Sequence, residues 1–295
     1  MAESLQTPLK TILNFRDAGR YINGVTGVER LRTGLFYRSA RPDEASFQDR
    51  QRLVKDFGVK SIIDLRTKTE HIEQAQKRDV KIKASAAIPQ TNEDVAEPLK
   101  IPGVTYHEIN FNGSSFSRML ISKLSWLEFF RLAGLMIFGY RKDAIKILAP
   151  HMNEMGLIGL AESSIDVCKG EVKQVFDVLT DEQNWPVLVH CTQGKDRTGL
   201  IVMLVLFLLD VDQAAIDQDY RLSESELAPE MESRVKEIQS IGLTEQFAIC
   251  PPHVVSSAYT HITTRYGSTQ KYLESAGVSG EAIDRLRRLL LADAS

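Results

Sequence analysis

One stretch of the chain, residues 186–199, constrains the fold more than any other part of the sequence. It contains the run Val187–Val189, whose β-branched and aliphatic residues are typical of a buried strand. It leads into Leu200–Leu209, which is apolar on every side and therefore predicts a buried helix. Cys191 and Arg197 lie in the short polar segment between the two. A buried strand that leads through a tight loop into a buried helix predicts an α/β fold, with this loop at a strand end.

The polar segment has the chemistry of a site for a phosphoryl group. Cysteine attacks only as its thiolate, and Cys191 leads into a helix N-terminus, where unpaired amides and the helix dipole favour negative charge. The amides that are expected to hold the phosphate oxygens belong to Thr192, Gln193, Gly194 and Lys195. Arg197 can bind two of those oxygens at once, which a lysine cannot do. The hydroxyl of Thr198 can donate to the sulfur and make it a better leaving group in a second step.

At these residues the chain resembles the cysteine-dependent phosphatases, whose loop reads His-Cys, five residues, then Arg-Ser/Thr-Gly. The inner sequence Gly194-Lys195-Asp196 is similar to one branch of the protein tyrosine phosphatase-like enzymes, which has mycobacterial, listerial and fungal-type members. The resemblance implies hydrolysis of phosphotyrosine, in some members of phosphoserine or phosphothreonine, and of phosphoinositides. It also implies the fold of that family, a central, mostly parallel sheet flanked by helices, with an inserted helical lid.

Three other interpretations of the stretch stay open. Cys191 could be a buried structural cysteine, although the polar residues around it would then have no purpose in a core. A sulfurtransferase also closes a cysteine loop on an arginine, but its loop is one residue shorter. An inactive phosphate-binding scaffold would keep the loop without catalysis, although every catalytic position is filled here.

The acid that protonates the leaving oxygen is expected inside the loop. Ordinary tyrosine phosphatases carry this acid in a Trp-Pro-Asp sequence, whereas here Val187 follows Trp185-Pro186. Asp196 is the first candidate, since the resembled branch has a catalytic aspartate at this position, and Asp64 is the second. Asp196 could instead orient Arg197 or repel wrong substrates. The mechanism needs no metal and the sequence has no cluster of metal ligands, so we expect no cofactor.

Two further residues of the loop have expected roles. Lys195 is expected to place a positive charge at the rim of the loop. In the resembled branch a lysine here accompanies activity on phosphoinositides, and the alternative is a solvated side chain. His190 is expected to form a hydrogen bond near the loop and to help keep Cys191 ionised, rather than to act as a base.

Segments at both ends of the chain extend the resemblance. Asn14-Phe15-Arg16-Asp17 and Tyr37-Arg38-Ser39 resemble two signatures of the same branch, and Tyr266-Gly267-Ser268 resembles its C-terminal pattern. The charged residues of the first two segments either form ion pairs at the edge of the sheet or contact the substrate.

A helix and a strand are predicted between these segments and the loop. Ser46 is a candidate N-cap, Gly58 can end the helix, and Val59–Leu65 has the composition of a buried strand. Ligands of open α/β sheets bind beyond the C-terminal ends of the strands. Asp64 and Arg66 are therefore expected near the loop, in either a substrate-binding or a structural role.

The segment Met119–Tyr140 is rich in aromatic and aliphatic residues. Lys123, Glu128 and Arg131 interrupt it, which argues against a membrane-spanning helix. It is either a plain core helix or part of a lid, within a helical insertion at about residues 115–165. A lid would shield the thiolate, and its apolar surface could contact a membrane peripherally.

Composition and charge exclude several classes of function. The chain has 295 residues and no visible linker, so we interpret residues 1–295 as a single tyrosine-phosphatase-like domain. A net charge of −3 gives no general attraction to nucleic acid. Three cysteines are too few for a disulfide framework and suit a reducing compartment. Because residues 1–10 have no signal-peptide pattern, a cytoplasmic location is expected, whereas the sequence does not indicate an oligomeric state.

Overall fold

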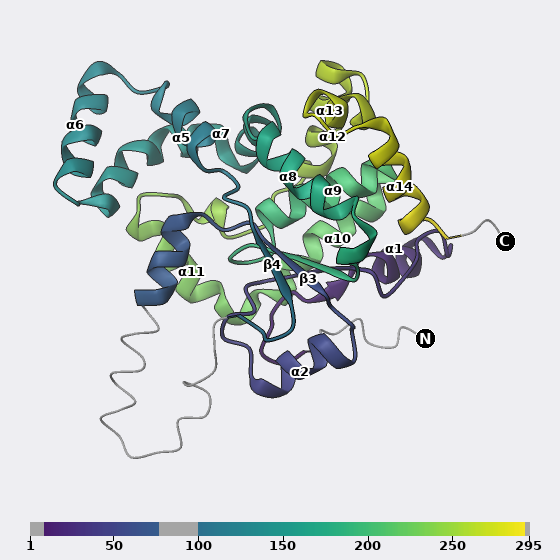
Figure 1. Cartoon of the computed structure of the whole chain (residues 1–295). Helices are drawn as coiled ribbons and strands as arrows, with labels where there is room; N and C mark the ends of the chain where they lie inside the picture. Colours follow the sequence, from purple (N-terminus) through teal and green to yellow (C-terminus); the bar gives the residue numbers. More distant parts are fainter. Residues whose placement is uncertain (1–8, 77–99, 293–295) are drawn as a thin grey trace, which may run out of the picture.

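The computed structural model describes residues 9–76 and 100–292, and its centre is a five-stranded sheet (Figure 1). The strands are β1 (Arg16–Asp17), β2 (Phe36–Ser39), β3 (Ser61–Asp64), β4 (Thr105–Glu108) and β5 (Val187–His190). Their order is β1-β2-β5-β3-β4, with β1 antiparallel at one edge and all other pairs parallel. The predicted central, mostly parallel sheet is therefore confirmed.

Helices cover both faces of the sheet and also extend beyond it (Figure 1). The α-helices are α1 (Ala18–Thr26), α2 (Phe47–Lys55), α5 (Ser114–Ile121), α6 (Trp126–Ile137), α7 (Arg141–Val167), α8 (Lys169–Leu179), α9 (Asp196–Leu208), α10 (Gln213–Glu226), α11 (Met231–Ser240), α12 (Val254–Tyr266), α13 (Thr269–Ser275) and α14 (Gly280–Leu290). Short 3₁₀ helices lie at Glu182–Asn184, Ala228–Glu230 and Glu245–Phe247. Residues 68–76 form a further helical segment.

Side chains of the central strand alternate between two apolar cores. Val187 and Val189 belong to the larger core and Leu188 to the smaller one, as the period of two along a strand requires. The larger core contains α9, which is buried throughout Thr198–Leu208, as expected of a helix that is apolar on all sides. Leu53 of α2 belongs to the smaller core. Both faces of β5 are covered, and β5 is the middle strand of the sheet. Cys191, which follows β5, is therefore held at the centre of the sheet.

Helices α5, α6 and α7 are inserted between β4 and α8 and extend away from the sheet (Figure 1). Helix α6 begins with a capping box, in which the side chains of Ser125 and Glu128 each accept a hydrogen bond from the other residue's amide. One side of α6 packs on α7, with Leu132, Ala144 and Ile147 at the centre of the contact. The segment 119–140 is therefore two helices separated by a cap rather than one continuous helix.

The outer side of α6 is apolar and exposed. Trp126, Leu127 and Ile137 have exposed fractions of 79%, 84% and 81%, and Leu132 is the buried residue of this helix. The interpretation of this segment as a plain core helix is therefore wrong, while its movement as a lid stays a prediction. In the part of the chain that the structure describes, no helix combines the length and apolarity needed to cross a membrane.

Candidate active site

A glycine allows the bend of the loop after β5. Residues 191–195 connect β5 to α9, and Gly194 has a φ of 66°, a left-handed conformation that glycine adopts without steric penalty. A Cβ on Gly194 would lie 2.0 Å from the carbonyl oxygen of Ser39 on β2. The loop therefore lies directly against the neighbouring strand, and only glycine fits at the point of closest approach.

The carbonyl groups of the loop are all held on one side. Four consecutive carbonyls accept hydrogen bonds. The carbonyl of Cys191 accepts from Nδ1 of His190 at 3.0 Å, and that of Thr192 accepts from the amide of Arg41 at 3.1 Å. The carbonyls of Gln193 and Gly194 accept from Nδ2 of Asn14 at 3.0 Å and 3.1 Å, and that of Gly194 also accepts from Nη2 of Arg38 at 2.7 Å. In a trans peptide the N–H points away from the C=O. The amides of residues 192–195 therefore point to the opposite side of the loop, where they can bind an anion.

The ring of His190 has a fixed orientation behind Cys191. A carbonyl oxygen can only accept, so Nδ1 of His190 carries the hydrogen in its bond to Cys191. Its Nε2 lies 3.6 Å from Oδ2 of Asp64. The predicted hydrogen bond of His190 near the loop is present, whereas its effect on the ionisation of Cys191 stays a prediction.

Two buried arginines share one carboxylate beneath the loop. Asp219 on α10 accepts from Nε of Arg16 at 2.6 Å and also from Nη1 of Arg38. Burial would raise the pKa of Asp219, but the two arginines outweigh it and lower the pKa below its ordinary value. Of the two roles expected for Arg16 and Arg38, the structure shows ion pairing. Because Arg38 also binds the carbonyl of Gly194, this ion pair supports the loop.

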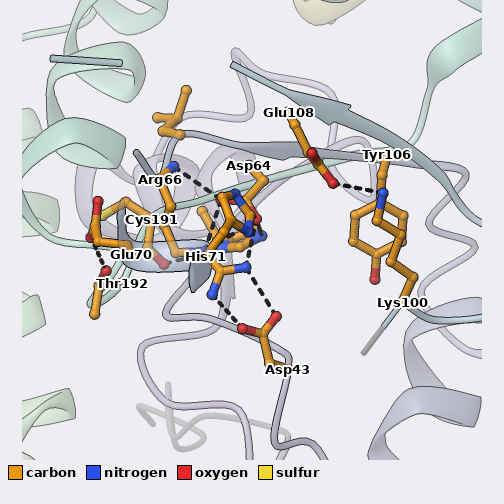
Figure 2. Close-up of polar contacts among 12 residues, drawn as sticks. Asp43, Asp64, Arg66, Glu70, His71, Lys100, Tyr106, Glu108, Cys191 and Thr192 are labelled. Carbon is orange, nitrogen blue, oxygen red and sulfur yellow. Dashed lines mark hydrogen bonds and ion pairs between the residues drawn. The ribbon is translucent and has the colours of Figure 1, made fainter. Parts of the chain in front are cut away.

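Arg197 is bound on both terminal nitrogens by Glu70, in the helical segment 68–76. Nη1 lies 2.6 Å from Oε2 and Nη2 lies 2.6 Å from Oε1. Oε1 also accepts from the hydroxyl of Thr192, a contact that Figure 2 shows. Burial would raise the pKa of Glu70, but its bonds to Arg197 and Thr192 lower it to about 2. Glu70 is therefore ionised at neutral pH and connects both ends of the loop.

Asp64 lies near the loop, as expected, but is occupied by other groups. Its carboxylate accepts from Nη2 of Arg66 at 2.6 Å, and Arg66 also binds Asp43 (Figure 2). Burial would raise the pKa of Asp64, yet His190 and Arg66 hold it well below its usual range. A carboxylate that is 1% exposed and stays ionised cannot protonate a leaving group. The structural alternative therefore fits Asp64, and the expected acid and substrate-binding roles do not.

Asp196 and Thr198 present unused polar atoms at the start of α9. The side chain of Asp196 is 40% exposed, and its buried Oδ1 lies 3.5 Å from Nζ of Lys195, with no hydrogen-bond partner among the described residues. The buried hydroxyl of Thr198 likewise has none within the described ranges. The exposed remainder of the Asp196 side chain can reach a substrate, so its role as the acid stays a prediction, and Thr198 keeps a donor for the sulfur.

The placement expected for Lys195, at the rim of the loop, is wrong. Its side chain is fully buried, and Nζ donates to the carbonyl oxygens of Phe247 (3.1 Å) and Ile249 (2.6 Å). These carbonyls belong to the connection between α11 and α12, so the lysine ties the loop to that segment. A fully buried ammonium cannot recognise a lipid headgroup by contact, although the amide of Lys195 still faces the anion side.

Two cavities adjoin the loop. One, of about 290 Å³, has Asp196, Arg197 and Glu70 in its wall, together with apolar side chains such as Phe116 of α5 and Leu160 of α7. The other, of about 850 Å³, is lined by loop residues Thr192 and Gln193 and by side chains of α11 and the segment 68–76. Helices α5 and α7 of the insertion therefore contribute to the site, while α6 lines neither of these cavities.

Comparison with known proteins agrees with this geometry. The sequence model of the tyrosine phosphatase family matches residues 7–292, which is nearly the whole chain. The chain belongs to the tyrosine phosphatase family. The predicted family is thereby confirmed.

Members of the tyrosine phosphatase family and inositol diphosphatases are among its relatives. The triple specificity protein phosphatase PtpB of Mycobacterium tuberculosis is 36% identical over 125 residues, which cover 36% of this chain and 44% of that protein. A tyrosine-protein phosphatase of Nostoc commune is 32% identical over 129 residues, or 40% and 43% of the two chains. The inositol diphosphatase DSP2 of Arabidopsis thaliana is 26% identical over 175 residues, or 57% and 51%. The chain thus matches less than half the length of the first two relatives.

In this member of the tyrosine phosphatase family, two residues of the site, Glu70 and Asp219, were not expected from the sequence. Thr67-x-x-Glu70 is a capping-box pattern, and the structure shows both of its hydrogen bonds. That pattern marks a helix start directly after Arg66 and could have drawn attention to Glu70. Asp219 has no such signal, because it is one of several carboxylates on a polar helix.

Proposed function

We propose that the chain hydrolyses phosphomonoesters through a cysteinyl-phosphate intermediate. In the first step the Cys191 thiolate attacks phosphorus, so that an S–P bond forms and the P–O bond to the leaving group breaks. Asp196 gives its proton to the departing oxygen. Arg197 and the loop amides stabilise the charge on the equatorial oxygens.

In the second step a water molecule attacks phosphorus and gives its proton to the Asp196 carboxylate. The S–P bond breaks and its electron pair returns to the sulfur of Cys191, to which Thr198 donates a hydrogen bond. Inorganic phosphate leaves, and Cys191 and Asp196 are back in the ionisation states in which they began. The partly exposed side chain of Asp196 and the unpartnered hydroxyl of Thr198 support these two assignments.

The observation that carries this proposal is the arrangement of the loop. Four carbonyls are held outward, which leaves four amides facing the anion side between Cys191 and Arg197. The test compares p-nitrophenyl phosphate hydrolysis by the wild type, by Cys191→Ser and by Cys168→Ser, a buried cysteine between α7 and α8. We expect turnover and an acid-stable labelled phosphoenzyme in the wild type and in Cys168→Ser, and neither in Cys191→Ser.

A different result would favour the alternative function. If the wild type binds phosphopeptides but does not hydrolyse p-nitrophenyl phosphate, the chain is an inactive phosphate-binding scaffold. Hydrolysis that survives in Cys191→Ser would exclude the cysteinyl-phosphate mechanism.

The substrates that we propose are phosphotyrosine proteins, together with phosphoserine, phosphothreonine and phosphoinositides. The relatives' names include a triple specificity protein phosphatase and inositol diphosphatases. The apolar cavity beside Asp196 and Arg197 favours an aromatic leaving group. A panel of a phosphotyrosine peptide, a phosphoserine peptide and a phosphoinositide, compared by kcat/KM, tests whether phosphotyrosine is the preferred substrate. A higher kcat/KM for phosphoserine than for phosphotyrosine would contradict it.

We also propose peripheral membrane contact through the segment 119–140 and a cytoplasmic location. The exposed apolar side of α6, with Trp126, Phe130 and Ile137, supports the membrane contact. Arg118 on α5, Arg131 on α6 and Lys123 in the turn between them are exposed, which favours an anionic lipid surface. Three unpaired cysteines support a reducing compartment.

A further inference from the structure

We infer that the larger cavity beside the loop binds the peptide next to a phosphorylated residue and selects peptides with a basic side chain there. The inference rests on the proposed function, since it names the substrate class of the same loop. It favours phosphoproteins over phosphoinositides that carry further phosphates. The charges in the wall of the cavity and one unpartnered side-chain amide carry it.

The cavity begins at the catalytic loop. Thr192 and Gln193, the two residues after the nucleophile, form one part of its wall, and side chains of α11 and the segment 68–76 form others. Its volume is about 850 Å³, and ligand pockets typically have about 300–1,000 Å³. The wall is mainly polar, with Ile145 and Ile241 as its apolar side chains. A substrate whose phosphate is held by the loop therefore has room here for polar groups beside the phosphorylated residue.

Each arginine in the wall is already paired with a carboxylate. Nη2 of Arg41 lies 3.2 Å from Oε1 of Glu230, and Nη1 of Arg234 lies 2.8 Å from Oε2 of Glu237. The third arginine, Arg66, has two carboxylate partners. A second phosphate would have to compete with these carboxylates for a cation. The cavity is therefore a poor site for a further phosphate on the substrate.

Two carboxylates of the wall remain open to a cation. Glu73 is exposed on the segment 68–76 and forms no ion pair with another described residue. The side chain of Glu237 is 49% exposed although it binds Arg234, and a carboxylate can accept about four hydrogen bonds. A lysine or arginine side chain in the cavity is attracted by both groups, whereas an acidic side chain is repelled.

A second observation points to a peptide rather than to a lone cation. Gln193 is only 6% exposed, and its side-chain amide forms no hydrogen bond within the described residues. A carboxamide offers both donors and an acceptor, and leaving them unbonded in a buried place costs free energy. In an extended peptide the N–H and C=O of one residue point to the same side and can pair with both ends of a carboxamide. Gln193 can therefore bind the main chain beside the phosphorylated residue.

The test compares three phosphotyrosine peptides that carry arginine, alanine or glutamate on both sides of the phosphotyrosine. The measured quantity is the ratio of kcat/KM for the arginine peptide to that for the alanine peptide in the same protein, so that changes in folding or chemistry cancel. For the wild type we expect a ratio of about five, the effect of partly exposed ion pairs, and a lower kcat/KM for the glutamate peptide than for the alanine peptide. Added salt should reduce the ratio.

Charge variants of the wall should move this ratio in opposite directions. Glu73→Gln should lower it by about twofold, and Glu73→Lys should reverse the preference in favour of the glutamate peptide. Arg234→Gln releases Glu237 and should raise the ratio. Glu232→Gln is the matched control, because this exposed residue of α11 pairs with Lys236 and is not part of the wall, so the ratio should stay within about 1.5-fold of the wild-type value.

The contact of Gln193 with the peptide main chain has its own test. Gln193→Met keeps the length of the side chain but removes the donors and the acceptor. We expect kcat/KM for the alanine peptide, divided by that for free phosphotyrosine, to fall by about five- to tenfold, the effect of one or two hydrogen bonds. The arginine preference should remain, since the carboxylates that cause it are unchanged. An unchanged ratio of peptide to free phosphotyrosine would refute this contact.

Three results would overturn the inference. One is an equal kcat/KM of the wild type for all three peptides, and another is a preference that Glu73→Lys leaves unchanged. The third is a higher kcat/KM for a phosphoinositide with several phosphates than for the arginine peptide, because the cavity would then accept phosphates. A wild type that hydrolyses p-nitrophenyl phosphate but shows no peptide preference refutes this inference alone. If no substrate is hydrolysed, the proposed function fails, and dissociation constants of the same three peptides, measured by calorimetry, still decide the inference.

Discussion

Gly194 lies so close to Ser39 that a Cβ on the glycine would be 2.0 Å from the serine's carbonyl oxygen. Gly194→Ala should therefore lower the free energy of unfolding by about 3 kcal/mol or more, since a left-handed conformation and a backbone clash add together. Thermal and urea unfolding measure this change. Gly24→Ala, in α1 with nothing near its Cβ, is the control and should be neutral or stabilising by up to about 1 kcal/mol. Equal stability of the two variants would show that the loop can move away from β2.

Asp219→Asn should destabilise the protein strongly. The substitution leaves Arg16 and Arg38 buried without their counter-charge, which typically costs about 3–5 kcal/mol. Asp217→Asn, on the same helix in a loose pair with Arg221 at 3.9 Å, should cost less than about 1 kcal/mol. Urea unfolding at neutral pH compares the two variants. A small effect of Asp219→Asn would mean that water reaches these arginines.

Ionised Glu70 should contribute stability that is lost in acid. The pKa of Glu70 is about 2 in the folded protein, against an ordinary value of 4.5, so the unfolded chain binds the proton more readily. The contribution, about 3 kcal/mol, is complete above pH 4.5 and disappears as the pH falls toward 2. We expect the difference in unfolding free energy between the wild type and Glu70→Gln to shrink as the pH is lowered below 4.5. A difference that is independent of pH would show that the carboxylate is not what stabilises the fold.

Asp196→Ala should make turnover depend on the leaving group. Without the acid, hydrolysis of alkyl and phenyl phosphates should fall by about 10²–10⁴-fold, whereas esters with acidic leaving groups should be less affected. A plot of log kcat/KM against leaving-group pKa for wild type and variant gives the measurement. Parallel plots for the two proteins would show that Asp196 is not the acid and would favour the alternative that it orients Arg197.

Leu127→Ser on α6 should affect binding to membranes and not stability. Leu127 is 84% exposed, so the free energy of unfolding should change by less than about 0.5 kcal/mol. Sedimentation with vesicles that contain an anionic phospholipid should show weaker association than for the wild type. Val28→Ser, 60% exposed and just after α1, is the control and should change neither property. Equal sedimentation of all three proteins would refute membrane contact through α6.

The local elements could be predicted from the sequence because their signals are local. Ser46 caps α2, as predicted, since an N-cap depends on a few adjacent positions. The position of Cys191 at a strand end followed from the apolar runs on either side of the loop. The place of the nucleophile in the fold is therefore encoded by its immediate neighbours in the chain.

The contacts that complete the site could not be predicted, because they join distant segments. Glu70 reaches Arg197 across 127 residues and Asp219 reaches Arg16 across 203. The orientation of the Lys195 side chain could not be predicted either, because a lysine in a polar loop is usually solvated. Here its ammonium group donates to two backbone carbonyls instead. On α6 the apolar composition indicated burial, but the helix lies at the periphery, where only one side has a partner.

Lys195 gives the loop a positive charge that no substrate touches. Its ammonium is enclosed and bonded to two neutral carbonyls, with a carboxylate oxygen of Asp196 at 3.5 Å. A charge in the interior acts on its surroundings through a lower dielectric than a charge on the surface, and dissolved ions screen it less. Added salt should therefore weaken the attraction of exposed arginines for a phosphate more than that of Lys195. We therefore expect part of the proposed affinity for phosphate to persist at ionic strengths that remove long-range steering.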